Sequence, residues 1–294
     1  MSENIVEFKN VSKWYGEGEN RTEVLSNINL TIQEGEFLAI VGFTGSGKTT
    51  LINLISGLLK PDEGEVLFKG KPINGTSHER GIIFQNYSLL PWLNVFQNVA
   101  LAVKEVHPDW SQEQLTEHTE RFIEMVHLSP AKNKLPKELS GGMRQRVSVA
   151  RALSMDPEML LMDEPLGALD ALTRGVLQEE ILRIWSANRR TALLITNDVD
   201  EGVFMADRII PLNPGPNATL GPEYTIELDR PRDKKALNSD PKFKEVRTAI
   251  LNYLVDLGEA AKLEKKAEFI LPDYKPMMPN SRSFPFFRRK KGRA

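Results

Sequence analysis

Glycine, lysine and threonine residues with the spacing of a phosphate-binding loop occur at residues 42–49, which read Gly-Phe-Thr-Gly-Ser-Gly-Lys-Thr. Glycines let the backbone curl so that successive N–H groups point at one phosphate. Lys48 adds a positive charge toward the β- and γ-phosphates, and the Thr49 hydroxyl is placed for Mg²⁺. The helix that begins here directs the positive end of its dipole at the same anion. The pattern predicts an ATP site formed by Gly42, Thr44, Gly45, Ser46, Gly47, Lys48, Thr49 and Thr50.

The segments on either side of this loop have the character that the loop needs. An apolar, β-branched run precedes it at residues 37–41, and an amphipathic helical run follows it at residues 51–56. Gly57 suits the position just after a helix end. We therefore expect a strand, the loop and a helix in succession. The alternative is an ordinary glycine turn between a strand and a helix.

A second set of chemical groups ends the apolar run at residues 159–164, Met-Leu-Leu-Met-Asp-Glu. An apolar run without alternation is typical of a parallel strand that is covered on both faces. Ligands of such sheets bind at the carboxyl ends of the strands. We expect Asp163 to hold the Mg²⁺ shell and Glu164 to orient or deprotonate the attacking water. The alternative is a pair of solvated acids that merely end a strand.

A third segment, Leu139-Ser140-Gly141-Gly142, could begin another helix that points at an anion. Ser140 is a natural N-cap, and Gly141 and Gly142 allow close approach of the backbone to a phosphate. Together with the two segments above, it resembles the signature motif of the ATP-binding cassette (ABC) ATPases. The resemblance implies a head-to-tail dimer, in which ATP lies between the phosphate loop of one subunit and the Ser140 segment of the other. Taken alone, the segment is also an ordinary helix cap.

Three further positions match the family. Tyr15 matches the aromatic residue that stacks on adenine, although simple packing in a turn and the neighbouring Trp14 are alternatives. Gln85 matches the glutamine that contacts Mg²⁺ and water and senses the membrane partner. Asp170 matches the loop that crosses the dimer interface. The resemblance covers about residues 4–235.

Asn197 is a departure from the family pattern, because a histidine that contacts the γ-phosphate usually stands there. Asparagine can donate a neutral N–H to a phosphate oxygen, but it cannot become a cation or relay a proton. The substitution fits a working but weaker site, or a degenerate site that a different ATPase subunit compensates. Asn197 is also compatible with a plain capping role at the helix that begins near Asp198.

The resemblance implies an α/β fold: a P-loop ABC nucleotide-binding domain with a RecA-like, mostly parallel sheet core, an antiparallel β-subdomain, a helical subdomain and a C-terminal extension. We expect the ATPase domain at residues 1–235, its helical subdomain at about 93–157, and a helix with a basic, flexible tail at 236–294. The patterns predict strands at 5–9, 24–32, 37–41, 64–70, 159–163, 191–196, 208–212 and 224–228, and helices at 95–106, 111–126, 142–154 and 240–257.

Composition agrees with a cytosolic enzyme. The chain has 294 residues, no cysteine and a net charge of −2. It therefore has no disulfide framework and no electrostatic footprint for nucleic acid. No signal segment begins it, and no run approaches the length of a membrane span. The end, with Phe284, Phe286 and Phe287 before a basic stretch at 288–293, fits either an anionic lipid contact or a solubilising tail.

Segments 89–99 and 213–221 look like those of nitrate, sulfonate, taurine and bicarbonate importers, and 213–221 with the Asp-Val-Asp-Glu at 198–201 looks most like the nitrate type. The resemblance implies a peripheral subunit on the cytoplasmic side of the inner membrane. Its implied partners are a second ATPase subunit (the same chain or a different one), transmembrane permease subunits and a periplasmic or lipid-anchored solute-binding protein. The alternatives are a soluble ABC ATPase outside transport and a domain that binds ATP without hydrolysis.

Overall fold

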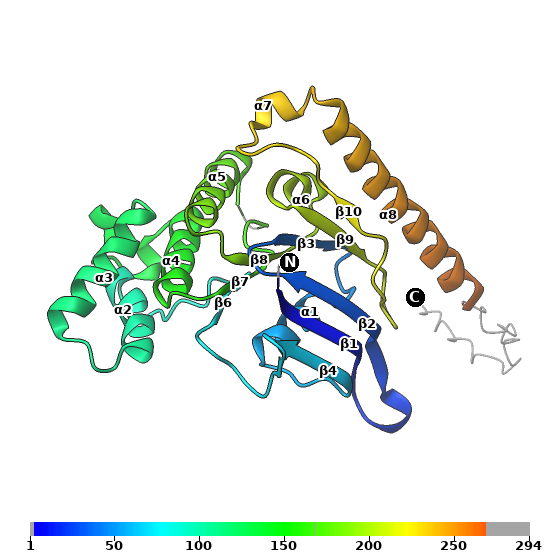
Figure 1. Cartoon of the computed structure of the whole chain (residues 1–294), viewed down its shortest axis with the longest axis horizontal. Helices are drawn as coiled ribbons and strands as arrows, with labels where there is room; N and C mark the ends of the chain where they lie inside the picture. The colour runs from blue at the N-terminus through cyan, green and yellow to red at the C-terminus, as the bar shows by residue number, and fades with distance from the viewer. Residues whose placement is uncertain (1–2, 168, 269–294) are drawn as a thin grey trace, which may run out of the picture.

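The computed structural model describes residues 3–167 and 169–268, and a six-stranded sheet lies at its centre (Figure 1). The sheet has the order β10-β9-β3-β8-β7-β6. All neighbouring pairs from β9 to β6 are parallel, and β10 joins one edge antiparallel. The strands are β3 (Phe37–Gly42), β6 (Arg80–Ile83), β7 (Met159–Asp163), β8 (Thr191–Thr196), β9 (Arg208–Leu212) and β10 (Tyr224–Thr225). The carboxyl ends of the five parallel strands therefore meet at one edge.

The parallel strands are buried because each of them serves two hydrophobic cores. Phe37, Ala39 and Val41 of β3 belong to a cluster that the helices complete, whereas Leu38 and Ile40 belong to a second cluster on the opposite face. This two-sided burial explains why the apolar runs of the sequence show no alternation. The expected strands 37–41, 159–163, 191–196 and 208–212 are confirmed.

The second core lies between the parallel sheet, α1 (Lys48–Ser56) and a four-stranded antiparallel sheet of order β2-β1-β4-β5. The strands of this sheet are β1 (Asn4–Tyr15), β2 (Thr22–Gln33), β4 (Glu63–Phe68) and β5 (Lys71–Pro72). They include the expected strands 5–9 and 24–32 and most of 64–70. Gly57 ends α1 in the left-handed region, with φ of 80°, as the sequence predicts.

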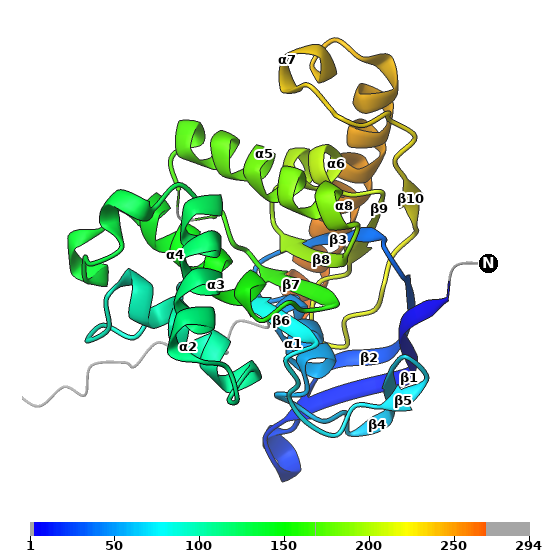
Figure 2. The same cartoon turned by 60° about the vertical axis from the view of Figure 1, so that its left-hand side comes forward.

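Three helices gather at one end of the molecule, away from the antiparallel sheet (Figure 2). They are α2 (Val95–Val106), α3 (Gln112–Met125) and α4 (Gly141–Ser154). The Ser111 side chain begins α3 by accepting the Gln114 N–H at 3.2 Å, so the expected cap is confirmed. None of residues 93–157, all of which the structure describes, lies in a strand.

Two helices cover the face of the parallel sheet that lies opposite α1. They are α5 (Ala171–Asn188) and α6 (Val199–Met205). α5 was not expected from the sequence. Its apolar pattern is blurred because Leu172 and Val176 point to solvent, with 84% and 53% of their surfaces exposed, and because Gly175 interrupts it.

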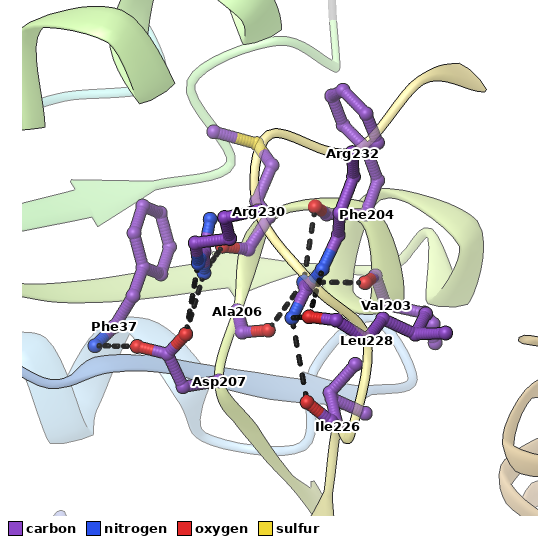
Figure 3. A network of polar contacts seen from close by, with 10 residues as sticks. Phe37, Val203, Phe204, Ala206, Asp207, Ile226, Leu228, Arg230 and Arg232 are labelled. Atoms are coloured by element: carbon purple, nitrogen blue, oxygen red, sulfur yellow. Dashed lines mark hydrogen bonds and ion pairs between the residues drawn. The ribbon is translucent and has the colours of Figure 1, made fainter. Parts of the chain in front are cut away.

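β10 is shorter than the expected strand. The carbonyl groups that follow it accept hydrogen bonds from an arginine instead of from a neighbouring strand. Strand structure was expected through Leu228 but ends at Thr225. Arg232 is buried and donates to the carbonyls of Val203, Phe204, Ala206, Ile226 and Leu228 (Figure 3). Burial lowers the pKa of Arg232 to about 10, so it remains a cation at neutral pH. This guanidinium ties the segment to the end of α6.

The described part of the chain ends with α7 (Lys234–Leu237) and the long α8 (Pro241–Glu268). Asp240 begins α8 by accepting the N–H groups of Lys242 and Phe243, as expected, but the helix continues well past the expected end at residue 257. Gly258 lies inside the helix, and a Cβ there would lie 3.1 Å from the Phe43 ring, so the glycine lets α8 pack closely against the phosphate loop. The basic segment at 288–293 lies outside the described residues. None of the described helices has the length and apolar character needed to cross a membrane.

Candidate active site

The predicted chemical groups come together at the carboxyl edge of the parallel sheet. The phosphate loop follows β3, Asp163 and Glu164 lie at the end of β7, and Asn197 follows β8. Gln85 comes two residues after β6. Sheet topology, rather than sequence proximity, therefore assembles this site.

Two positions of the phosphate loop have a backbone conformation that favours glycine. Gly45 and Gly47 have φ angles of 82° and 99°, in the left-handed region that glycine tolerates. A Cβ on Gly47 would lie 2.9 Å from the side chains of Val24 and Leu25. Ser46 is 1% exposed, and its hydroxyl has no hydrogen-bond partner in the described structure. Thr44 is exposed and Thr50 is buried.

Lys48 is held at the centre of this loop. Its side chain is 4% exposed, and Nζ donates to the carbonyls of Gly42 at 3.0 Å and Phe43 at 2.8 Å. Nζ also donates to Asn197 Oδ1 at 2.6 Å. Burial lowers the pKa of Lys48, and the nearby carboxylates of Glu164 and Asp163 oppose that shift. A desolvated ammonium in this position is a strong binding group for an anion.

Asp163 and Thr49 supply neighbouring oxygen atoms. Thr49 Oγ1 donates to Asp163 Oδ1 at 3.2 Å, and Asp163 is 7% exposed. Burial raises the pKa of Asp163, so a cation beside the carboxylate would be favourable. Among the described residues, no three His, Cys, Asp or Glu side chains are grouped to hold a metal ion. The neighbouring oxygens of Thr49 and Asp163 are donors of the type that Mg²⁺ takes, together with phosphate oxygens and water.

Glu164 lies between the Lys48 ammonium and the Gln85 side-chain amide. Its Oε1 is 3.6 Å from Lys48 Nζ, and its Oε2 accepts a hydrogen bond from Gln85 Nε2 at 3.2 Å. Its backbone has a φ angle of 44°, which is uncommon for a residue with a side chain, and its N–H donates to Ile195 O at 2.9 Å. Strained backbone of this kind collects at functional sites.

The Tyr15 side chain lies beside the first turn of α1. Its hydroxyl lies 3.4 Å from Thr50 Oγ1, and 44% of the residue is exposed. The neighbouring Trp14 is covered by Arg21, whose guanidinium lies 3.6 Å from the ring centroid. Lys13 Nζ lies 5.8 Å from the centroid of the Tyr15 ring, so each of the two aromatic residues has a cation beside it. Tyr15 is the more exposed of the two.

Ser140, Gly141, Gly142 and Asp170 are not brought to the phosphate loop. Ser140 caps α4 by accepting the Met143 N–H at 3.3 Å, and Asp170 caps α5 by accepting the Thr173 N–H at 3.0 Å. A Cβ on Gly142 would lie 2.5 Å from Thr173 Cγ2, so these two helix starts touch each other. Among the described residues, no hydrogen bond joins the four to residues 42–50.

The alternative role of Asn197 as a helix cap is wrong. Asp198, not Asn197, caps α6, because its side chain accepts the N–H groups of Asp200 and Glu201. The Asn197 carbonyl oxygen is engaged with Lys48 instead. Its side chain therefore belongs to the site.

A hollow of about 870 Å³ opens beside these side chains. Its lining includes Gln85, Glu164 and Asn197 together with Leu251, Leu254 and Val255 of α8, so the long C-terminal helix borders the site.

Comparison with known proteins shows which family the chain belongs to. The family model described as ABC transporter matches residues 25–167. The chain is 46% identical, over 78% of its length, to 84% of the nitrate import ATP-binding protein NrtD of Synechococcus elongatus. The chain belongs to the ABC transporter family. It is also 42% identical, over 86% of its length, to 97% of the nitrate transport protein NasD of Klebsiella oxytoca. The resemblance seen in the sequence is confirmed.

Further relatives and a solved structure agree with this membership. The bicarbonate transport ATP-binding protein CmpD of Synechococcus elongatus is 45% identical over 84% of this chain and 88% of its own length. The dimeric structure of the ATP-binding cassette MJ0796 in a post-hydrolysis state, bound to ADP and Pi, superposes with a TM-score of 0.68 at 32% identity. It covers 76% of this chain and all of the other. The expected cassette fold, an ATP-hydrolysing one, is confirmed.

The sequence did not reveal the side-chain contacts that fix the two residues flanking Asn197. The Thr196 hydroxyl accepts the Asp198 N–H at 3.0 Å and donates to Glu201 Oε2. Glu201 was noted only as part of a family-like tetrapeptide. The sequence signal was a glutamate in the first turn of a helix, which is common at any helix start and does not reveal that this one is buried.

Proposed function

We propose that this chain binds ATP with Mg²⁺, hydrolyses the ATP, and thereby drives uptake of a small oxyanion through a separate permease. The observation that supports it most directly is the convergence of Lys48, Asp163 and Glu164 at one edge of the sheet, with 3.6 Å between the lysine and Glu164. The names of the relatives, which are ATP-binding components for nitrate and bicarbonate, support the transport role.

The roles of the side chains follow from their charges and contacts. Lys48 and the N–H groups of the loop bind the phosphates, for which the Ser46 hydroxyl is a further unpaired group. Thr49, Gln85 and Asp163 are the residues that would hold Mg²⁺, which supplies charge neutralisation on the phosphates when bound. Glu164 is held by Gln85 and accepts the proton of the attacking water. Tyr15 stacks on the adenine, and Asn197 contacts the γ-phosphate.

The four residues that do not reach the phosphate loop indicate a second subunit. Ser140, Gly141, Gly142 and Asp170 present a helix N-terminus and its neighbouring loop, and a helix N-terminus binds anions. We propose that they complete the site of a partner ATPase subunit. The ADP-bound cassette that this chain resembles is itself dimeric.

The remaining partners are those of an importer. We propose a peripheral position on the cytoplasmic side of the inner membrane, on transmembrane permease subunits, with a periplasmic or lipid-anchored solute-binding protein and no nucleic acid partner. Nitrate is the proposed solute, because segments 198–201 and 213–221 look most like the nitrate type. Bicarbonate is the second candidate, because a bicarbonate relative is nearly as similar as the nitrate one.

The test is to reconstitute the chain with its co-purifying permease and solute-binding protein in liposomes. ATP hydrolysis is then measured with nitrate or bicarbonate on the side of the membrane that holds the solute-binding protein. Stimulation by nitrate, abolished in a Glu164→Gln complex, is the expected result. Stimulation by bicarbonate alone would overturn the choice of solute. Hydrolysis that neither anion changes, with no permease bound to the chain, would overturn the transport role.

A further inference from the structure

A buried carboxylate lies directly behind the site, outside the roles assigned above. Glu201 is 4% exposed and lies in the first turn of α6. Its Oε2 accepts a hydrogen bond from the Thr196 hydroxyl, and its Oε1 accepts one from Gln178 Nε2 at 3.0 Å. Burial raises the pKa of Glu201, so burying this carboxyl is costly.

Glu201 fixes the two residues on either side of Asn197. It holds Thr196 through the hydroxyl, and the same hydroxyl accepts the Asp198 N–H at 3.0 Å. Between them Asn197 places Oδ1 at 2.6 Å from Lys48 Nζ. The turn that presents Asn197 to Lys48 is thus held by one buried acid.

The same line of contacts runs outward to the C-terminal extension. Gln178 of α5 receives a hydrogen bond on Oε1 from Lys234 Nζ, and Lys234 is the first residue of α7. Burial lowers the pKa of Lys234. Arg232, two residues before it, anchors the segment to the end of α6 (Figure 3).

We propose that Glu201 is a positioning residue for ATP hydrolysis, and that Gln178 and Lys234 hold it in place, so that the C-terminal extension helps to set the position of Asn197. This inference rests on the proposed contact of Asn197 with the γ-phosphate. It assigns a role in the reaction to an element outside the phosphate loop and α4.

The order of donors and acceptors makes the chain of contacts directional. Lys234 can only donate, so Gln178 must turn its oxygen to Lys234 and its NH₂ group to Glu201. Glu201 then offers two acceptor oxygens to two donors, Gln178 and Thr196. A glutamine at position 201 has only one acceptor oxygen, so one of these two donors loses its partner, and an unpaired buried group is costly.

The exchanged pair Gln178→Glu with Glu201→Gln restores every contact. The carboxylate introduced at position 178 would accept from Lys234 and from the NH₂ group introduced at position 201. The amide oxygen introduced at position 201 would accept from Thr196. Gln178→Glu alone would place two carboxylates side by side, which is unfavourable. The single variants should therefore fail where the double variant works.

The experiment uses the full chain in its complex with the permease, and measures kcat, the ATP dissociation constant and the melting temperature. Glu201→Gln and Gln178→Glu should each lower kcat roughly five- to tenfold, with the ATP dissociation constant within about twofold of the wild type. The double variant should recover most of kcat. Lys234→Met should lower kcat severalfold, whereas Lys235→Met, the exposed neighbour on α7, should not.

Two results would overturn the inference. One is a Glu201→Gln complex with the kcat of the wild type. The other is a double variant no better than the singles, with kcat falling only as far as the melting temperature does, which would make the contacts purely structural. An Asn197→Ala complex measured in parallel separates the two proposals. If Asn197→Ala loses activity and Glu201→Gln does not, only the positioning role fails. If Asn197→Ala is silent, the γ-phosphate contact fails first.

Discussion

At the scale of single residues, the site is a set of buried charges that need a ligand. Lys48 donates to two loop carbonyls and to Asn197, and it lies beside Glu164. The loop carbonyls hold the ammonium where a phosphate would meet it. Its present partners are mostly neutral, so a phosphate would offer it a stronger, charge-assisted contact.

Removal of this cation tests the loop. Lys48→Ala should abolish measurable ATP binding while the melting temperature falls only slightly, because the ammonium contacts the ligand side of the loop and fills no part of either hydrophobic core. Titration calorimetry with ATP and a thermal melt check this, with the exposed Lys60→Ala as control. A collapsed melting temperature in a protein that still binds ATP would contradict the assignment.

The proposed contact of residue 197 with the γ-phosphate predicts an effect on the rate of hydrolysis. A neutral donor stabilises the γ-phosphate less than a charged one, by ~1 kcal/mol, which corresponds to roughly fivefold in rate. Asn197→His should therefore raise ATPase activity severalfold in a homodimer, and much less in a heterodimer whose partner carries a histidine. Wild-type activity should lack the titration near pH ~6.5 that a working histidine imposes.

A steady-state ATPase assay of Asn197→His and Asn197→Ala over a range of pH makes the comparison. If both variants of a homodimer hydrolyse ATP at the wild-type rate, position 197 takes no part in the chemistry. The bond from Lys48 to Asn197 would then be a structural contact of the loop.

At the scale of elements, much was predictable where a local pattern decides the structure. The loop glycines, the acids after β7 and the caps of α3 and α8 were placed by their own residue types. What could not be predicted depends on distant partners. The carbonyls after β10 bind Arg232, and Gly258 lies inside α8 close to the Phe43 ring.

The same distinction applies to the site. The sequence indicated that Lys48 and Asn197 belong to it, but only the parallel pairing of β3 with β8 brings them into contact. Glu201 was missed because its importance comes from burial between α5, α6 and β8, which no periodicity in the short α6 reveals.

The start of α4 carries the prediction for the interface. Ser140→Arg should leave ATP binding to the single chain intact but abolish dimerisation and turnover, because the long cation would project from the helix start into the partner's site. ATP binding by calorimetry and molar mass by light scattering check both parts. Glu138→Arg, an equally bulky change on a nearby exposed position, should dimerise normally. Full turnover by a strictly monomeric Ser140→Arg protein would remove the case for a shared site.

At the scale of the whole molecule, the fold places two incomplete halves of a site at separate places. One half is the carboxyl edge of the sheet with its loop and acids, and the other is the paired starts of α4 and α5. Among the described residues, no hydrogen bond joins the second half to residues 42–50. We propose that two chains in opposite orientation bring the halves together, and the solved cassette that this chain resembles is dimeric.

The most direct test of this account is the molar mass and nucleotide content of the Glu164→Gln protein after incubation with ATP and Mg²⁺. Loss of a general base typically slows the chemistry by about 10²–10⁴-fold, so ATP should remain bound and unhydrolysed. The account predicts a stable dimer that retains intact ATP, whereas the wild type releases ADP and returns to monomer. A Glu164→Gln protein that hydrolyses ATP at the wild-type rate, as a monomer, would contradict it.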